Sequence, residues 1–317
     1  MDKKELLKAT LAGEDTGRLL GGFWHHFPTA SHHGEASVRA HLDFFQAVDA
    51  DMLKVMNEHM FRFDRPVVDI ANWATVKKLP FSRTPYGAHL EEVRAVRKRL
   101  PRDVPILATV HGVLVSAYHA TEKPGSFSNP DNLVSRHLRQ DPEAVAPALE
   151  VVTDTLIELC EHLAQEGVDG IYYAAQGGEE YRFSPELFSS HVAPYDKRVI
   201  DAVNGLGLMS FLHICKAKVM LPLYGRIKAD VVNWAVHDCR YKLADGRKIF
   251  GDATLLGGFD DRSGVLVEGT REEIEREIDA IVAEAGKRRF ILGADCTLPD
   301  DVELWRIRAV LEYARRI

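Results

Sequence analysis

The stretch LGLMSFLHI, residues 206–214, is a short apolar run that follows a helical pattern ending in glycines. Seven more segments of mostly apolar or β-branched residues recur along the chain. Such runs are typical of strands that are covered on both faces. The eight runs are RLLGGFW (18–24), DMLKVMN (51–57), VPILATV (104–110), VDGIYYAA (168–175), LGLMSFLHI (206–214), ADVVNWAV (229–236), ATLLGGF (253–259) and RRFILGA (288–294).

Helical patterns separate these runs. Residues 35–49 carry apolar side chains at three- and four-residue spacing, residues 184–207 begin with Ser-Pro, and residues 270–286 begin at a threonine cap and stop at a glycine. Eight strands that alternate with helices predict an α/β fold closed as a (β/α)8 TIM barrel. An open doubly wound sheet is disfavoured, because no run is followed by G-x-G-x-x-G or G-x-x-x-x-G-K-[ST].

A single domain is predicted over residues 1–317. The charged opening MDKKELLKATLAGED, residues 1–15, has a helical pattern and is interpreted as an N-terminal helical extension. Residues 112–140 form a long polar stretch, which we interpret as an inserted loop over one barrel mouth that could act as a lid. No internal repeat, low-complexity tract or Pro/Gly-rich linker divides the chain.

Composition narrows the function classes. The net charge of −7 argues against a nucleic-acid surface, which needs clustered lysine and arginine. No run of about 18 or more apolar residues is present, so we expect no membrane span, and the N-terminus lacks the apolar stretch of a signal peptide. Four cysteines in 317 residues do not form a disulfide scaffold and fit a reducing, cytoplasmic compartment.

Polar or metal-binding side chains follow every one of the eight runs. The carboxyl ends of barrel strands meet at one mouth, where barrel enzymes have their active sites. Random loop starts would more often bring Lys, Glu, Ser or Gly than His or Cys, so we predict a site at this mouth. Its candidate residues are His25, His26, Asn57, Glu58, His111, Gln176, His213, Cys215, His237, Asp238, Cys239, Asp260, Asp295 and Cys296.

His213 and Cys215 are candidates for binding a metal. They are two residues apart, so on a strand both side chains point to the same face, and Cys296 closes the last run. Thiolates and neutral imidazole are preferred zinc ligands, and three protein ligands leave a fourth position for water or substrate. Alternatively, the cysteines are small buried hydrophobes and the histidine is a satisfied core residue. The spacing alone leaves both interpretations open.

The two sequence segments that supply these candidate ligands resemble those of a known family. HIC at 213–215, followed by GADCTLPDD at 293–301, resembles the H-x-C…C signature of zinc methyltransferases in the uroporphyrinogen decarboxylase superfamily, which include the methylcobamide:thiol methyltransferases. Cobalamin-independent methionine synthase has a similar site on a related barrel. Residues 166–203, 253–278 and 290–310 are also similar to the family's fourth, seventh and closing strands with the helices after them.

This resemblance implies a zinc-dependent methyltransferase. Zn²⁺ held by His213, Cys215 and Cys296 would deprotonate a substrate thiol, and the thiolate would attack a methyl group of a methyl-corrinoid or a methylated small molecule. We expect a small-molecule substrate, a corrinoid protein as a candidate partner, no nucleic-acid or membrane partner, and a homodimer as one oligomeric state. We assign His237, Asp238 and His111 as catalytic, and His25, His26, Asn57, Glu58, Gln176 and Asp260 as substrate-binding.

Two departures from the family pattern concern the metal site. Lys216 follows the H-x-C, where the methyltransferases commonly have glycine. His237 and Asp238, 22 and 23 residues after Cys215, stand where a glutamate can also reach zinc in the methionine-synthase relatives. Either could be a fourth ligand or orient His213. Separately, the adjacent histidines 32 and 33 lie farther from the first run and are interpreted as surface residues.

The decarboxylase itself is a poorer match. It has MRQAGR near its N-terminus, where arginines bind substrate carboxylates, and an aspartate after the second strand. Here Arg18 is the only arginine of residues 17–35, and Asn57 and Glu58 stand where that aspartate is expected. Porphyrinogen decarboxylation is therefore not expected. The alternatives are a related lyase or demethylase acting on another small molecule, and a non-catalytic corrinoid-binding subunit. No D-x-H-x-x-G motif is present, so a corrinoid would come on a partner or as a free ligand.

Overall fold

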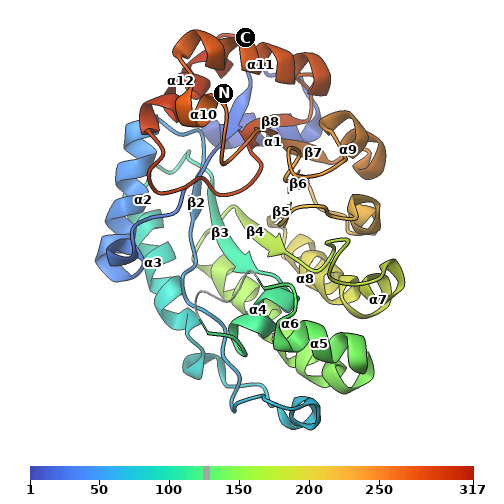
Figure 1. Cartoon of the computed structure of the whole chain (residues 1–317). Helices are drawn as coiled ribbons and strands as arrows, with labels where there is room; N and C mark the ends of the chain where they lie inside the picture. Colours follow the sequence, from blue (N-terminus) through green and yellow to red (C-terminus); the bar gives the residue numbers. More distant parts are fainter. Residues whose placement is uncertain (124–128) are drawn as a thin grey trace.

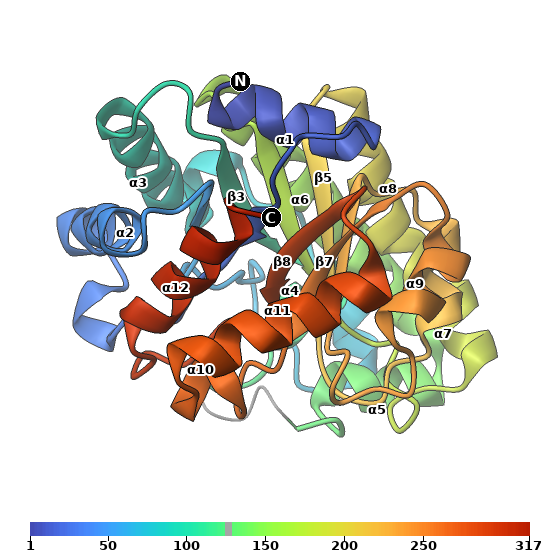
Figure 2. The same cartoon turned by 90° about the horizontal axis from the view of Figure 1, so that it is seen from above.

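The computed structural model describes residues 1–123 and 129–317, and its centre is a barrel of eight parallel strands. Each predicted run contains one strand, with β3 ending one residue beyond its run, so the TIM-barrel prediction is confirmed. Figures 1 and 2 show the helices around the outside of the strands. The strands are β1 (Leu20–Gly22), β2 (Leu53–Val55), β3 (Ile106–His111), β4 (Gly170–Ala175), β5 (Met209–Ile214), β6 (Val231–Trp234), β7 (Thr254–Phe259) and β8 (Phe290–Ala294).

α-Helices connect the strands, and short 3-10 helices lie in the loops. Within the described residues, no helix combines the length and the apolar character needed to cross a bilayer. The α-helices are α1 (Lys3–Ala12), α2 (Gly34–Val48), α3 (Tyr86–Arg99), α4 (Val113–His119), α5 (Leu133–Gln140), α6 (Pro142–Gln165), α7 (Pro185–His191), α8 (Ala193–Gly205), α9 (Leu243–Phe250), α10 (Val265–Glu268), α11 (Arg271–Ala285) and α12 (Leu304–Ala314). The 3-10 helices are η1 (Thr29–Ser31), η2 (Ile70–Thr75), η3 (Phe81–Arg83) and η4 (Leu221–Arg226).

The helix predicted over residues 184–207 is in fact two helices. α7 and α8 are separated at Val192, and Pro194 lies in the first turn of α8. In one continuous helix the ring of Pro194 would clash with the carbonyl of Ser190, so the chain begins a new helix instead. The other two predicted helices agree with α2 and α11 to within one residue at each end.

Most of the segment 112–140 is helical rather than an open loop. The residues 113–118 of α4 are all buried, and α5 buries Val134 and Leu138 on one face. The apolar residues of both helices pack into the barrel's outer layer, which is why they do not form the polar loop that we predicted. Residues 124–128 lie outside the described residues, and a lid function of this segment stays a prediction.

The predicted N-terminal helix, α1, covers the amino-terminal end of the barrel. Leu6 and Leu7 are buried against side chains that fill the barrel interior. Lys4 pairs with Asp169, directly before β4, at 2.6 Å. α1 therefore seals the end of the barrel opposite the mouth where the candidate site lies.

A side chain joins the first two strands. The sheet order runs from β1 through β8 and β7 round to β2, and seven of the eight neighbouring pairs form ladders within the described residues. Between β1 and β2, Asp51 accepts a hydrogen bond from the backbone N–H of Gly21 at 3.1 Å. Its carboxylate also accepts hydrogen bonds from both terminal guanidinium nitrogens of Arg18, at 3.3 and 3.1 Å. This carboxylate closes the barrel.

His41 is a buried histidine that joins α2 to the end of β2. Its Nδ1–H donates to the carbonyl of Ser37 at 2.7 Å, and its Nε2 accepts from the backbone N–H of Met56 at 2.9 Å. Burial lowers the pKa of His41 to about 4. Below about pH 6.5 the unfolded chain binds a proton at this ring and the folded chain does not. Acidification from pH 7 to 4.5 therefore costs about 2–3 kcal/mol of stability at this residue.

We expect His41→Gln to reduce this acid sensitivity. The variant should be less stable at pH 7, but its loss of stability between pH 7 and 4.5 should be smaller than that of the unaltered protein by about 2–3 kcal/mol. Urea unfolding at both pH values measures the difference, and His191→Gln, a more exposed histidine, serves as the control. Equal losses in the variant and the unaltered protein would show that His41 does not stay neutral in the fold.

Candidate metal centre

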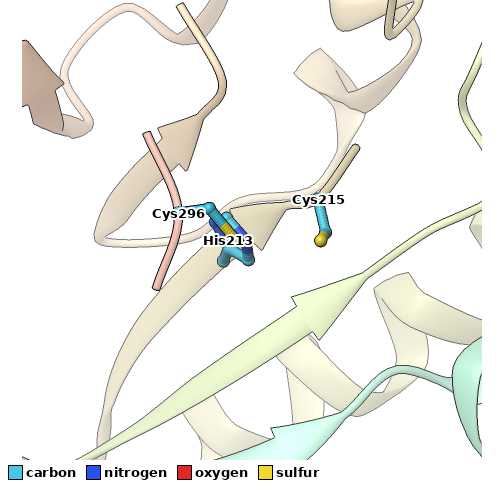
Figure 3. Close-up of side chains that lie close together, drawn as sticks. All are labelled: His213, Cys215 and Cys296. Carbon is cyan, nitrogen blue, oxygen red and sulfur yellow. Dashed lines mark hydrogen bonds between the residues drawn. The ribbon is translucent and has the colours of Figure 1, made fainter. Parts of the chain in front are cut away.

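His213, Cys215 and Cys296 come together at the carboxyl-terminal mouth of the barrel. His213 is on β5, Cys215 directly follows that strand, and Cys296 lies after β8. Their ligand atoms all lie within 4.8 Å of one another, and Cys296 Sγ is 3.4 Å from His213 Nε2; Figure 3 shows the three side chains. Zinc–ligand bonds of about 2.0–2.3 Å place neighbouring ligand atoms of a tetrahedral site about 3.3–3.8 Å apart. The three donors fit a zinc ion with its fourth position open.

Asn233 holds the imidazole of His213 in the tautomer that a metal requires. The two residues are in register on β6 and β5. Asn233 Nδ2 donates to the carbonyls of Leu256 and Ala294, at 2.9 and 3.1 Å, which fixes the amide orientation. Asn233 Oδ1 must therefore accept from Nδ1–H of His213, at 2.6 Å. The Nε2 atom of His213 keeps its lone pair for a metal, as in histidine ligands supported by a neighbouring acceptor.

The loop after Cys215 turns sharply. Lys216 and Lys218 both have positive φ, 84° and 55°. Glycine adopts this conformation without steric cost, so lysine is strained at position 216, where the resemblance leads us to expect glycine. Backbone bonds hold the turn. Lys218 N–H donates to the carbonyl of Asp238, and its own carbonyl accepts from Glu180 N–H, both at 2.9 Å.

The two thiols of the cluster have pKa values shifted in opposite directions because they face each other. A hydrogen bond from Cys215 holds the pKa of the Cys296 thiol well below its usual range. The contact with Cys296 and burial raise the pKa of Cys215. The pair is therefore arranged to share one proton, and a cation between the sulfurs would take that proton's place.

Lys54 is a residue of this mouth that the sequence analysis missed. It lies in the middle of β2, is 3% exposed, and its ammonium is 5.0 Å from the ring centroid of Trp24 and 4.3 Å from that of Tyr172. Within the described residues, it has no hydrogen-bond or ion-pair partner. Burial lowers the pKa of Lys54 to about 7, and the charges of Cys296 and Cys215 act against this shift. A lysine inside an apolar strand is the signal that could have revealed it.

Asp261, adjacent to the predicted Asp260, is a second missed residue. Asp261 is 6% exposed, and burial together with the charge of Cys296 raises its pKa to about 6. Its carboxylate pairs with Arg262 at 2.9 Å. Asp260 instead accepts hydrogen bonds from the N–H groups of Arg262 and Ser263 and from the Ser263 hydroxyl, so it stabilises its own turn.

The two histidines predicted after β1 have different surroundings. His25 is buried between Phe27 and Phe44, with ring centroids 4.7 and 4.8 Å away, and its Nδ1 has no hydrogen-bond partner among the described residues. Burial lowers the pKa of His25. The side chain of His26 is exposed, and its backbone N–H donates to Leu298 at 2.9 Å. His26 is thus the more accessible of the two to a substrate.

After β2, Asn57 supports the loop and Glu58 is the more available group. Asn57 is buried, donates to the carbonyl of Thr109 at 3.3 Å and accepts from the N–H of His59 at 3.0 Å. Glu58 is partly exposed, and its charge acts on Lys54. Substrate binding by Glu58 is therefore compatible with its position, whereas Asn57 has its hydrogen bonds satisfied.

His111 and Gln176 stand at the ends of β3 and β4. Burial lowers the pKa of His111 to about 4, and its ring packs edge-on against His119 at 4.9 Å. Gln176 is 7% exposed, and its Oε1 has no hydrogen-bond partner among the described residues. A buried acceptor without a partner is costly, which makes Gln176 a good candidate for binding a donor group of a substrate.

His237 and Asp238 do not contact the Nδ1 of His213, which Asn233 occupies. His237 Nδ1 is 3.0 Å from Asp295 Oδ2, and the same oxygen accepts the backbone N–H of His237 at 2.7 Å. This hydrogen bond raises the pKa of His237. The side chain of Asp238 is exposed. Catalytic roles for His237 and Asp238 stay predictions.

Comparison with known proteins places these features in a family. The family model described as uroporphyrinogen decarboxylase (URO-D) matches residues 30–317. This chain belongs to that family. A uroporphyrinogen decarboxylase from a Geobacter strain is 24% identical over 260 residues, which cover 80% of this chain and 73% of the relative. A methylcobamide:CoM methyltransferase from Methanosarcina acetivorans is 23% identical over 213 residues, covering 67% of this chain and 57% of the relative.

Solved structures support the fold of this uroporphyrinogen decarboxylase family member. A methyltransferase from Methanosarcina mazei matches it with a TM-score of 0.78 and 16% identity, over 99% of this chain and 98% of the other. A B12-independent methionine synthase from a Shewanella strain matches with a TM-score of 0.64 and 11% identity, over 94% and 97% of the two chains. The relatives of this chain thus include both decarboxylases and methyltransferases.

Proposed function

We propose that this chain is a zinc-dependent methyltransferase that activates a thiol for attack on a methyl group from a methyl-corrinoid or a methylated small molecule. The observation that carries the proposal is the set His213, Cys215 and Cys296, whose donor atoms lie within 4.8 Å at the barrel mouth. Two sulfurs and one imidazole form an open zinc site. Relatives whose name specifies methylcobamide support the reaction class and the choice of methyl donor.

Zinc bound here would supply a Lewis acid that keeps a substrate thiol deprotonated at neutral pH. The chain supplies the surroundings. Asn233 holds His213 with Nε2 free, so the ligand needs no reorientation. Two cysteinates balance the charge of Zn²⁺, so a substrate thiolate adds one uncompensated negative charge. The ammonium of Lys54, buried near both cysteines, stabilises that charge more effectively than it would in water.

Two further tasks fall to side chains at the barrel mouth. One is to carry away the proton of the substrate thiol, and the other is to bind the methyl donor. The side chain of His237 is 38% exposed, and its hydrogen bond to Asp295 favours the protonated ring, which suits a proton carrier. Gln176 offers a buried acceptor without a partner, and His26 and Glu58 are accessible at the mouth. We assign these three residues to binding of the methyl donor.

A porphyrinogen decarboxylase is the competing assignment, since relatives with that name are 24–26% identical to this chain. A substrate with many carboxylates needs free arginines. Arg18 instead binds Asp51 at the amino-terminal end of the barrel. Arg182 is fully buried with Glu179, with N–O distances of 2.9 and 3.1 Å. These two arginines are therefore not available to substrate carboxylates, which supports the methyltransferase assignment.

The test uses zinc-loaded protein, methylcobalamin and a panel of small neutral, anionic and cationic thiols. We expect thiol binding to release about one proton per site at neutral pH, because the metal stabilises the thiolate, and methylcobalamin to be demethylated. A pH indicator and the methylcobalamin absorbance record the two events, and Cys239→Ser serves as a control outside the cluster. Zinc-loaded protein that releases no proton with any thiol would contradict the proposal.

A further inference from the structure

A second cluster of metal-binding side chains lies on the outer flank of the barrel, where the loops after β1 and β2 meet α2 and α3. His33 is directly before α2, His59 is in the loop after β2, and Glu92 is on α3. The ligand atoms of these three residues lie within 4.8 Å of one another. Figures 1 and 2 show α2 and α3 side by side on this flank. Three segments that are distant in sequence thus bring two imidazoles and a carboxylate together.

The geometry of this cluster is compact. His59 Nε2 is 3.2 Å from both carboxylate oxygens of Glu92. The ring centroids of His33 and His59 are 4.7 Å apart. The backbone N–H of Gly34 donates to Glu92 Oε1 at 2.6 Å, which fixes one oxygen. A separation near 3.2 Å is close to the spacing of about 3.3 Å between nitrogen and oxygen ligands on one tetrahedral zinc ion.

His89 provides an independent observation. It is completely buried, one helical turn before Glu92, and neither ring nitrogen has a hydrogen-bond partner among the described residues. Its Nδ1 is 4.0 Å from Glu92 Oε2. A buried imidazole without partners is unfavourable, because its desolvation is not compensated. His89 is thus a buried polar side chain beside the cluster whose hydrogen-bonding capacity is unused among the described residues.

An open cleft gives solvent access to the cluster. The cleft has a volume of about 230 Å³ and is lined by His33, His59 and Glu92 together with Glu35 and Glu91. The lining therefore attracts cations, although Glu35 is already paired with Arg99 at 2.6 Å. An ion can reach the cluster from this side without passing through the barrel.

We propose that His33, His59 and Glu92 form a second divalent-metal site, selective for zinc-like ions, that ties the loop after β2 to α2 and α3. Two imidazoles and a carboxylate are typical ligands of Zn²⁺, and three protein ligands leave room for water. The site shares no residue with the sulfur-containing cluster, and its role is to stabilise the segment that follows the strand carrying Lys54.

The test titrates the full-length protein with Zn²⁺ and, as a spectroscopic probe, with Co²⁺. We expect about two equivalents to bind to the unaltered protein and about one to the C215S/C296S variant. Co²⁺ bound to that variant should show weak visible bands and no sulfur-to-cobalt charge-transfer band. The variant His33→Ala, at an exposed position, should keep the charge-transfer band of the sulfur site. Its affinity for the second metal ion should be at least about tenfold weaker than that of the unaltered protein. His32→Gln is the matched control, because His32 bonds to the Phe27 carbonyl outside the cluster.

Two outcomes would overturn the proposal. One is that C215S/C296S binds no metal ion at micromolar concentrations, which would leave the flank cluster as an ion pair between His59 and Glu92. The other is that His33→Ala binds both equivalents as tightly as the unaltered protein. Urea unfolding of C215S/C296S with and without Zn²⁺ gives a further readout, since a ligand that binds only the folded chain raises the midpoint. His33→Ala should remove that increase.

Discussion

Serine at both Cys215 and Cys296 will remove the zinc held at the barrel mouth and reduce thiol-dependent methyl transfer at least about 10³-fold. Serine hydroxyls are not deprotonated at neutral pH and are poor zinc ligands, so His213 alone would remain. The affinity for zinc should fall by more than about 10²-fold, since two of three ligands are lost. Elemental analysis of the purified variant measures the bound zinc, and the methylcobalamin assay measures the activity.

A matched control separates this effect from general loss of a thiol. Cys239 is also buried after a strand, but its sulfur accepts from the Tyr241 N–H and contacts the Val219 carbonyl, outside the cluster. Cys239→Ser should keep both zinc equivalents and the activity. If the double serine variant bound as much zinc as the unaltered protein and gave the same cobalt spectrum, the sulfur site would not exist.

Replacement of Lys54 by methionine should lower the enzyme's activity without lowering its stability. Methionine fills the volume of the lysine stem but has no charge, so the substrate thiolate would lose its nearby cation. We expect the turnover number to fall by about 10²–10³-fold, as for the loss of one preorganised donor. The free energy of unfolding should stay constant or rise, because a buried ammonium without a hydrogen-bonding partner is unfavourable.

Activity with a saturating thiol and urea unfolding at neutral pH measure the two quantities for Lys54→Met. Lys197→Met, which removes an exposed lysine paired with Asp201, is the control and should change neither strongly. A Lys54 variant that is fully active, or one that loses activity only because it unfolds, would show that this ammonium does not act on the reaction.

The barrel was predictable because its strands are buried on both faces. Each strand is a short apolar run, and the helices between them have the 3.6-residue period, so the number and order of elements follow from the pattern alone. The break at Val192 was not predicted, although Pro194 is the local signal for it. The helical content of residues 112–140 was missed because the polar centre of that segment dominated its composition.

The three sulfur and imidazole ligands were predictable because their residue types are rare at strand ends. Their supporting residues were not. Lys54 and Asn233 lie inside β2 and β6. One polar residue does not prevent an apolar run from being assigned as a strand, so neither residue is recognised from sequence as part of a site. Whether Lys54 and Asn233 point into the barrel depends on which face of each strand is turned inward, and the sequence does not give that orientation. Lys54 follows Met52 by two residues and Asn233 follows Val231 by two, and both of those apolar residues fill the barrel interior.

The contact between β1 and β2 depends on a single side chain, that of Asp51. A ladder of backbone bonds fixes the spacing of two strands whatever side chains they carry, whereas the spacing at this join depends on the carboxylate of Asp51. Replacement of Asp51 by alanine should therefore loosen this join at the amino-terminal end of the barrel, whereas the seven laddered joins are held by backbone hydrogen bonds that no side-chain substitution removes.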